Sequence, residues 1–217
     1  VASACALSLV LAKNNKIVDV VCDDFEAPKN LKFLPQIEKI NPGLKNLQKI
    51  IVSINNAKEK IDQFNYNIED EKLKIYITPK DGSLTSDDIS IETSEFKYDL
   101  IFVLDTPELE SLGKVYNHSS EFFYNTSIIN IDHKAENEQF GQINLTDPNS
   151  VATSEILFDL INGIQEGIID QNIATCLLTG LVAKTRSFKT ANIRPKTLEI
   201  ASQLLSLEAD QQKIIQN

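Results

Sequence analysis

The sequence predicts an α/β fold: a doubly wound, mainly parallel sheet flanked by helices, with a small antiparallel β-insertion. Two continuous apolar runs, YDLIFVLD (98–105) and SIINIDH (127–133), have the composition of parallel strands covered on both faces. Several other segments repeat apolar residues at helical spacing. Residues 49–78 instead alternate with a period of two, which is typical of antiparallel strands.

The N-terminal part of the chain predicts a helix, a strand and a second helix. Residues 2–13 are small and aliphatic and predict a helix, and IVDVVCDD (17–24) then predicts a buried strand. Residues 28–43 predict a short helix that stops at Asn-Pro-Gly. Its apolar face would consist of Leu34, Ile37 and Ile40.

The insertion, residues 44–97, contains the short runs KIIVSIN, QFNYNIE and KLKIYIT, separated by polar turns such as EDEK. After it, each predicted parallel strand finishes in polar residues: Asp105 in the first case, Asp132 and His133 in the second. Ligands of open α/β sheets bind outside the carboxyl ends of the strands. These three residues are therefore candidates for a functional site.

Three helices are predicted in the C-terminal part. Residues 153–164 carry an apolar stripe at i, i+3 and i+4 spacing. Asp170 is suited to the N-cap of a second helix, and Pro195 to the first turn of a third.

Composition narrows the classes of function. A chain of 217 residues with 42% hydrophobic residues can bury one good core or two small ones. The formal net charge of -10 argues against strong nucleic-acid binding, because phosphate contacts need clustered lysines and arginines. The apolar stretch 2–12 is shorter than the roughly 20 residues that span a bilayer, so no membrane association is expected.

The three cysteines, Cys5, Cys22 and Cys176, are odd in number, far apart and without a CxxC pair. This pattern predicts buried thiols in a reducing compartment, and hence a cytoplasmic protein.

The string SIINIDHKAENEQFGQINLTDPNSVATSEILFDLI (127–161) resembles the third motif and following helix of the DHH-family phosphoesterases, above all the oligoribonuclease/pAp phosphatase branch. The order strand, Asp-His, Asn, Phe-Gly, then Ser/Thr-Ser-Glu-Ile-Leu is specific as a set. The similarity extends to residues 2–21, 98–113, 169–188 and 192–205.

The resemblance implies one DHH-like domain over residues 1–217, interrupted by the insertion at 44–97. The family's first motif, which supplies two aspartates, would lie upstream of residue 1. Residues 192–217 would begin the linker helix toward a C-terminal substrate domain that the chain lacks.

In active members of the family, two divalent cations, usually manganese, are bound by aspartates and histidines from several strand ends. Asp105 matches the aspartate of the second motif, which bridges both metals. Asp132 is the aspartate of the DHH triplet, and His133 matches its first histidine, a ligand of one metal.

Other motif positions are altered. Lys134 stands at the second histidine of the triplet. The fourth motif resembles VADTGSF in active relatives but reads VAKTRSF here, so that Lys184 replaces a metal-binding aspartate and Arg186 replaces a glycine. Replacing a carboxylate by an ammonium group changes the site by two charges, which repels a dication by several kcal/mol at about 4 Å even at a dielectric constant of about 20.

The sequence therefore predicts a degraded metal site: no cofactor is expected, or manganese if the family site persists. Lys184, with Lys134, would either pair with Asp105 in place of the cation or point to solvent. Together with Arg186, these changes predict a pocket that accepts a nucleotide or another phosphate-containing ligand without hydrolysing it.

Two alternatives stay open. The chain could be an active metal-dependent phosphoesterase that holds a single metal and acts on short oligoribonucleotides, pAp or a related nucleotide. It could also be a structural or interaction module whose β-insertion supplies an edge strand to a protein partner.

Overall fold

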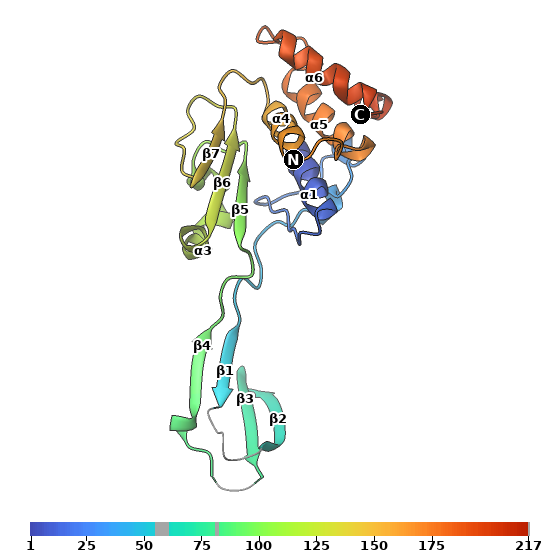
Figure 1. Ribbon diagram of the computed structural model, residues 1–217. Coiled ribbons are helices and arrows are strands. Elements are labelled where there is room, and N and C mark those ends of the chain that lie inside the picture. The colour runs from blue at the N-terminus through green and yellow to red at the C-terminus, as the bar shows by residue number, and fades with distance from the viewer. Residues whose placement is uncertain (55–60, 81–82, 217) are drawn as a thin grey trace. The chain divides into compact units, whose positions relative to one another are not determined.

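The computed structural model describes residues 1–54, 61–80 and 83–216, which form two compact units (Figure 1). The larger unit comprises residues 1–45 and 98–217, and the smaller unit residues 46–97. Each unit has its own set of strands.

The larger unit is built on a three-stranded parallel sheet in the order β5-β6-β7 (Figure 1). These strands are β5 (Leu100–Leu104), β6 (Ser127–Asp132) and β7 (Ile143–Thr146). The α/β class and both apolar parallel strands predicted from the sequence are confirmed. Strand β7 was not predicted, because its four residues, INLT, are too few for a pattern to emerge.

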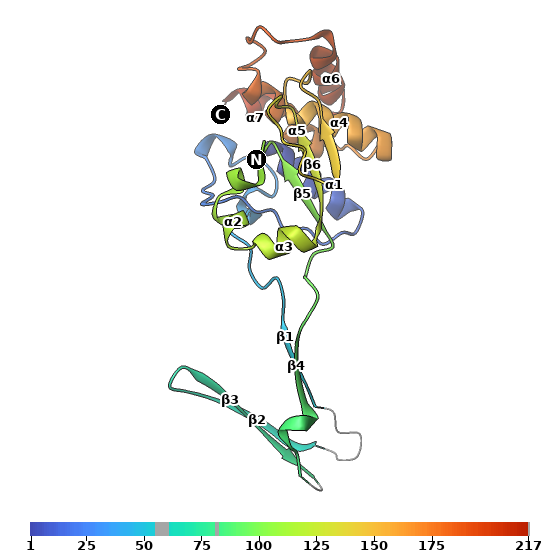
Figure 2. The same cartoon turned by 90° about the vertical axis from the view of Figure 1, so that its left-hand side faces the viewer.

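Helices α1 (Ala2–Lys13), α4 (Thr153–Ile164) and α5 (Gln171–Lys184) pack against one another, and α4 also contacts β6 (Figures 1 and 2). Two further helices, α6 (Pro195–Ser206) and α7 (Gln211–Gln216), pack on α5. The short helices α2 (Lys114–Asn117) and α3 (Ser120–Asn125) lie between β5 and β6 in the chain. The predicted helices at 2–13 and 153–164 are confirmed.

Helix α5 lies at the centre of the core. The carboxylate of Asp170 caps it as predicted, since its Oδ1 accepts a hydrogen bond from the Ile173 amide at 2.9 Å. Gly180 lets α4 approach closely: a Cβ at this position would lie 2.0 Å from the Ser154 Oγ. The buried apolar residues of α5 are Ile173, Ala174, Cys176, Leu177, Leu178 and Leu181.

Two predictions near the N-terminus are wrong in part. Residues 17–24 form no buried strand: Ile17 is 90% exposed, and the segment makes a single parallel bridge between Val21 and Asn41. Residues 28–43 form two 3-10 turns, η1 (Lys29–Leu31) and η2 (Ile37–Lys39), instead of one helix. Pro35 donates no backbone hydrogen bond and Gln36 is left-handed, with φ of 69°, so an α-helix cannot continue between them. The predicted apolar face is nevertheless buried in the core: Leu34, Ile37 and Ile40.

The cysteines differ in exposure. Cys5 and Cys176 are buried, but Cys22 is exposed, so the prediction of buried thiols is wrong for Cys22. The reason is local, because Cys22 lies in the segment that does not form the expected strand. Among the described residues, no helix is long and apolar enough to cross a membrane.

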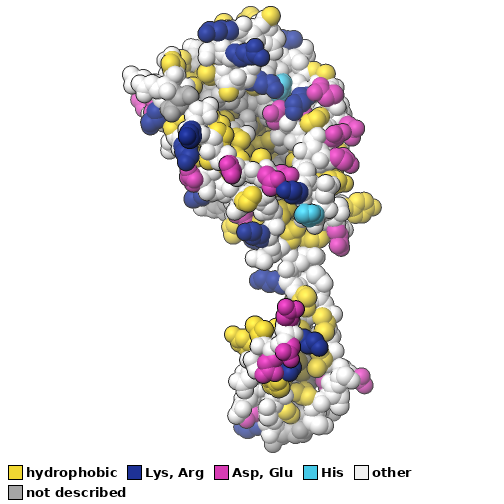
Figure 3. Space-filling view, turned by 180° about the vertical axis from the view of Figure 1, so that it is seen from behind, with side chains coloured by type: hydrophobic (Ala, Val, Ile, Leu, Met, Phe, Trp, Pro, Cys, Tyr) yellow, Lys and Arg dark blue, Asp and Glu magenta, His cyan; other side chains and the backbone are white. Residues whose placement is uncertain are grey.

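The smaller unit consists of two antiparallel ribbons. Strand β1 (Ile50–Ile54) pairs with β4 (Ile89–Thr93), and β2 (Ile61–Glu69) pairs with β3 (Lys72–Pro79). The prediction of antiparallel strands is confirmed for all three runs, whereas β4 was missed. Within the described part of residues 46–97 no side chain is buried, and many hydrophobic side chains are exposed (Figure 3).

Candidate metal centre

The candidate site lies at the carboxyl ends of β5 and β6. Asp105 follows the last residue of β5, while Asp132 ends β6 and His133 follows it. Because the two strands are parallel neighbours, their carboxyl ends meet at one edge of the sheet. One ligand atom from each of these residues lies within 4.8 Å of the others, and among the described residues this is the group of three that could hold a metal ion.

The backbone of Asp105 is left-handed, with φ of 56°. Its amide donates to the Ile131 carbonyl at 3.0 Å, so the residue still pairs with β6 while the chain turns away from the sheet. Aspartate tolerates this conformation better than most residues other than glycine. The turn leaves the carboxylate half exposed at the sheet edge.

His133 contributes a nitrogen without a hydrogen bond. Its Nε2 is buried and lies 3.5 Å from the Asp105 Oδ1, which is within ion-pair range but long for a hydrogen bond. A buried imidazole nitrogen normally finds a partner. An unpartnered nitrogen aimed at a carboxylate therefore has the character of a metal ligand.

Asp132 has a different role, because both of its oxygens are already used. Oδ1 accepts from the amides of His133 at 2.7 Å and Lys134 at 3.3 Å, and Oδ2 accepts from the Asn137 side chain at 2.9 Å. The residue is fully buried. Asp132 thus fixes the turn that carries His133 and Lys134, and as a ligand it would have to share its lone pairs.

A network of asparagines supports this turn. The Asn137 amide also donates to the Thr106 carbonyl at 2.9 Å, and the Asn130 amide donates to the Asn137 and Asn144 oxygens at 2.7 Å and 3.0 Å. The network joins the ends of β5 and β6 to β7. The sequence indicated Asn137 only as part of the family motif, and it gave no prediction that Asn130 and Asn144 belong to the site. Asn130 was detectable, because a polar residue inside the apolar run SIINID needs a partner when buried.

Lys134 contacts Asp105 directly. Its Nζ lies 3.5 Å from Asp105 Oδ1 and donates to the Asp105 carbonyl oxygen at 2.7 Å. Its side chain is only 25% exposed, so the ammonium group is held at the site.

Lys184 and Arg186 lie at and just beyond the end of α5, and both are exposed. Lys184 is near enough for its charge to act on Asp105, whose ion pairs are with His133 and Lys134. Arg186 begins three consecutive left-handed residues, with φ of 50°, 60° and 61° at Arg186, Ser187 and Phe188. The buried Thr185 holds this loop, since its Oγ1 accepts from the Phe188 amide at 3.0 Å.

The charges around Asp105 stabilise its ionised form. Burial by itself raises the pKa of the carboxyl group, but the interactions with His133, Lys134 and Lys184 outweigh burial and lower the pKa from 3.8 to about 2. The carboxylate is therefore ionised throughout the physiological range and is already compensated by cationic side chains.

The donors present fit one divalent ion. Two carboxylates and one imidazole are ligands that manganese and similar ions accept, and the unpartnered His133 Nε2 is free to serve. Against this, the Lys134 ammonium lies 3.5 Å from the Asp105 Oδ1 and places a positive charge beside the carboxylate. A bound ion would have to displace or tolerate this charge.

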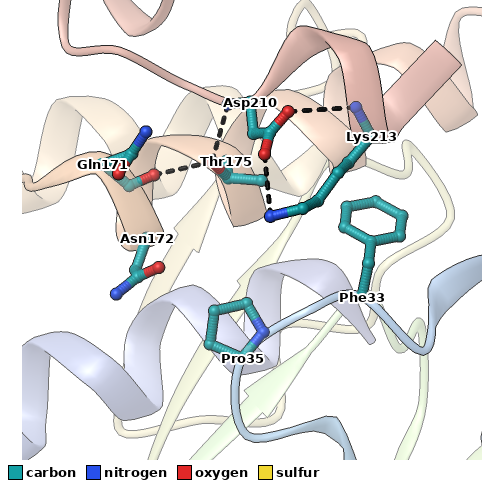
Figure 4. Close-up of a pocket in the computed structure, with 7 residues that line it drawn as sticks. All are labelled: Phe33, Pro35, Gln171, Asn172, Thr175, Asp210 and Lys213. Carbon is teal, nitrogen blue, oxygen red and sulfur yellow. Dashed lines mark hydrogen bonds and ion pairs between the residues drawn. The ribbon is translucent and has the colours of Figure 1, made fainter.

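A separate, small pocket lies where the start of α5 meets α7 (Figure 4). Its polar groups satisfy one another: Lys213 Nζ pairs with Asp210 at 2.9 Å, and Thr175 Oγ1 bonds the Gln171 carbonyl and the Asp210 amide. None of the strand-end residues lines this pocket. Its full lining consists of Phe33, Pro35, Gln171, Asn172, Thr175, Asp210 and Lys213.

Comparisons with known proteins identify the family of the chain. The family model for the DHH family, N-terminal domain, matches residues 1–181. Over 80 residues the chain is 39% identical to the bifunctional oligoribonuclease and PAP phosphatase NrnA of Thermus thermophilus, a match that covers 36% of this chain and 24% of NrnA.

Among solved structures, the fold is similar to that of an exopolyphosphatase-related protein from Bacteroides fragilis, with a TM-score of 0.67 and 21% identity. That match covers 98% of this chain and 50% of the other. The chain thus spans half of the length of this structural relative and about a quarter of NrnA.

Proposed function

Because this chain belongs to the DHH family, we propose that it is a phosphoesterase-like domain that binds a phosphate-containing ligand without hydrolysing it. The observation that carries the proposal is the Lys134 ammonium group, 3.5 Å from the Asp105 carboxylate. A cationic side chain here performs the charge compensation that a metal ion would otherwise provide. With a lysine in the place of a metal ion, the site has no Lewis acid to activate a water molecule.

Electrostatics favour this interpretation over a dinuclear centre. A lysine that already lowers the pKa of Asp105 also repels any dication bound to the same oxygen. Lys184 adds a second positive charge, since it too lowers the pKa of Asp105. A metal ion would have to displace or tolerate both.

Two exposed cationic side chains at the end of α5 suit an anion. Lys184 and Arg186 are exposed at the end of α5 and offer two positive charges close in sequence. NrnA is described as an oligoribonuclease and PAP phosphatase, so a nucleotide phosphate is the ligand class that we infer for this site.

Calorimetric titration with pAp tests ligand binding. We expect the chain to bind pAp without added metal, and the double substitution Lys184→Ala with Arg186→Ala to weaken binding at least about tenfold, as expected for two lost charge-assisted contacts. Lys196→Ala is the matched control, because Lys196 pairs with Asp159 on α4 at 2.6 Å. Equal binding by the double variant and the control would contradict an anion site at this loop.

Manganese titration and a hydrolysis assay test the loss of catalysis. We expect no manganese-dependent release of phosphate from pAp or a short oligoribonucleotide. The double substitution Lys134→His with Lys184→Asp restores the donor types of active relatives, and we expect it to bind manganese at least about tenfold more tightly than the unaltered chain. Unchanged manganese affinity would show that the lysines are not what opposes the metal.

A second candidate, an active phosphoesterase with one metal ion, is favoured by one observation. Asp105, Asp132 and His133 converge within 4.8 Å, and His133 Nε2 has no hydrogen-bond partner. In that case these three residues would hold the ion, which would supply an activated water. Manganese-dependent hydrolysis by the unaltered chain, lost in His133→Ala, would establish this candidate and exclude the first.

A further inference from the structure

The β2–β3 hairpin of the smaller unit has two chemically distinct faces. Its antiparallel register places apolar residues opposite one another at three successive positions on one face. We call this surface the hairpin face; it consists of Phe64, Tyr66, Ile68, Leu73, Ile75 and Ile77. The other face carries Gln63, Asn65, Asn67, Glu69, Lys72, Lys74, Tyr76 and Thr78.

The polar face carries interactions of its own. Glu69 accepts from Asn67 at 2.6 Å and pairs with Lys74 at 2.9 Å. A hairpin with one polar face and one largely apolar face has the pattern of a sheet that is covered on one side.

Nothing described in the smaller unit covers the hairpin face. Phe64 is 62% exposed, Tyr66 67% and Ile68 68%. The β1–β4 ribbon does not serve as cover, because Ile50 and Ile91 on its own apolar face are 74% and 72% exposed. An isolated two-stranded hairpin is marginally stable in water, and an exposed apolar surface of this kind is typical of an interaction site.

We propose that the partner is a second copy of this chain, packed hairpin face against hairpin face around a two-fold axis. The face has no charged residue, so two chains that each carry a net charge of -10 can meet here without placing like charges in contact. A two-fold contact places the same surface of both copies together, so that surface must complement itself. An apolar face meets this condition. The two hairpins form a small sandwich of the kind in which sheets pack about 10 Å apart.

The area is of the right size for a dimer. The five of these side chains that are more than about two fifths exposed offer roughly 600 Å² per copy, which is below but comparable with the about 800 Å² per partner of a standard stable interface. The contact uses the face of the hairpin instead of the strand edge expected from the sequence, and it does not depend on the state of the metal site.

Sedimentation velocity of the whole chain over a range of concentrations tests the proposal. We expect a monomer–dimer equilibrium with a dissociation constant on the order of 10 µM or tighter for an interface of this size. Tyr66→Lys places a charge at the centre of the hairpin face, and we expect it to raise the dissociation constant at least about tenfold. Tyr76→Lys is the matched control, because this tyrosine lies on the polar face of the same hairpin, opposite Asn65.

Leu73→Lys places a charge at a second position of the hairpin face, near the β2–β3 turn. It shows whether an effect of Tyr66→Lys comes from the hairpin face or from a local folding defect at position 66. Circular dichroism verifies that all three variants fold. Dimerisation that is lost in Tyr66→Lys and Leu73→Lys but kept in Tyr76→Lys supports the proposal. A chain that stays monomeric at about 100 µM, or a dimer that the three substitutions affect equally, overturns it.

Discussion

Replacing Lys134 with methionine should raise the pKa of Asp105. The substitution keeps the length and much of the apolar stem of the side chain but removes the ammonium group, which lies 3.5 Å from Asp105 Oδ1. His133 and Lys184 remain and still favour the ionised carboxylate. The pKa of Asp105 should therefore rise from about 2 part of the way toward 3.8.

The magnitude follows from distance and exposure. At 3.5 Å and an effective dielectric constant of about 20, the pair would gain about 5 kcal/mol before any cost of desolvation. The Asp105 side chain is 50% exposed, and exposed pairs contribute only about 0.2 to 1 kcal/mol. We therefore expect a rise of somewhat less than one pKa unit and a loss of about 0.5 to 1 kcal/mol in the free energy of unfolding at neutral pH.

The sign of the pH dependence is fixed by the lowered pKa. A carboxyl group whose pKa is lower in the folded state than in the unfolded state adds stability above the unfolded value, and that stability is lost as the pH falls through the folded value. The difference in stability between the original chain and Lys134→Met should be fully present above pH 3.8 and should vanish as the pH falls to about 2.

Carboxyl ¹³C chemical shifts measured by NMR report the titration of Asp105, and urea unfolding at several pH values reports the stability. Lys196→Met removes a comparable lysine whose ion pair is with Asp159, and it should leave the pKa of Asp105 unchanged. If Asp105 titrates at the same pH in Lys134→Met as in the original chain, Lys134 does not compensate its charge and the reasoning on the metal site is wrong.

Three further predictions concern the larger unit. Arg186→Gly should stabilise the chain by about 1 kcal/mol in urea unfolding, because the residue is left-handed with φ of 50°, whereas Lys189→Gly in the same loop should not stabilise. Gly180→Ala should destabilise it by about 1 to 3 kcal/mol, since the new Cβ would lie 2.0 Å from Ser154 Oγ; adding Ser154→Gly should recover much of the loss, and no recovery would locate the strain elsewhere. In the native protein a thiol reagent should modify Cys22 quickly and Cys5 and Cys176 slowly, because burial raises the pKa of both buried thiols; three equally fast cysteines would contradict the described core.

The elements that the sequence predicted correctly are those whose signal is local. Helix α4 has an apolar stripe along its length, and Asp170 caps α5 through an amide three residues away. The strand pattern at 17–24 was equally clear but misleading, because a strand also needs neighbours to pair with. The structure gives that segment one bridge, between Val21 and Asn41. Pairing is a long-range property, and composition alone does not report it.

The candidate site likewise has features that the sequence predicted and features that it did not. The position of Asp105 and His133 followed from the rule that parallel strands bring their carboxyl ends together. The contact between Lys134 and Asp105 could not be predicted, because the two residues are 29 positions apart in the sequence. A lysine at the end of β6 can either pair with Asp105 or extend into solvent, and the conformation of the turn after β6 determines which of the two occurs. Asp132 and Asn137 fix that turn through side-chain hydrogen bonds. This turn carries both His133 and Lys134, which reach the same carboxylate, and we infer that the residue at position 134 sets whether a lysine or a metal ion compensates Asp105.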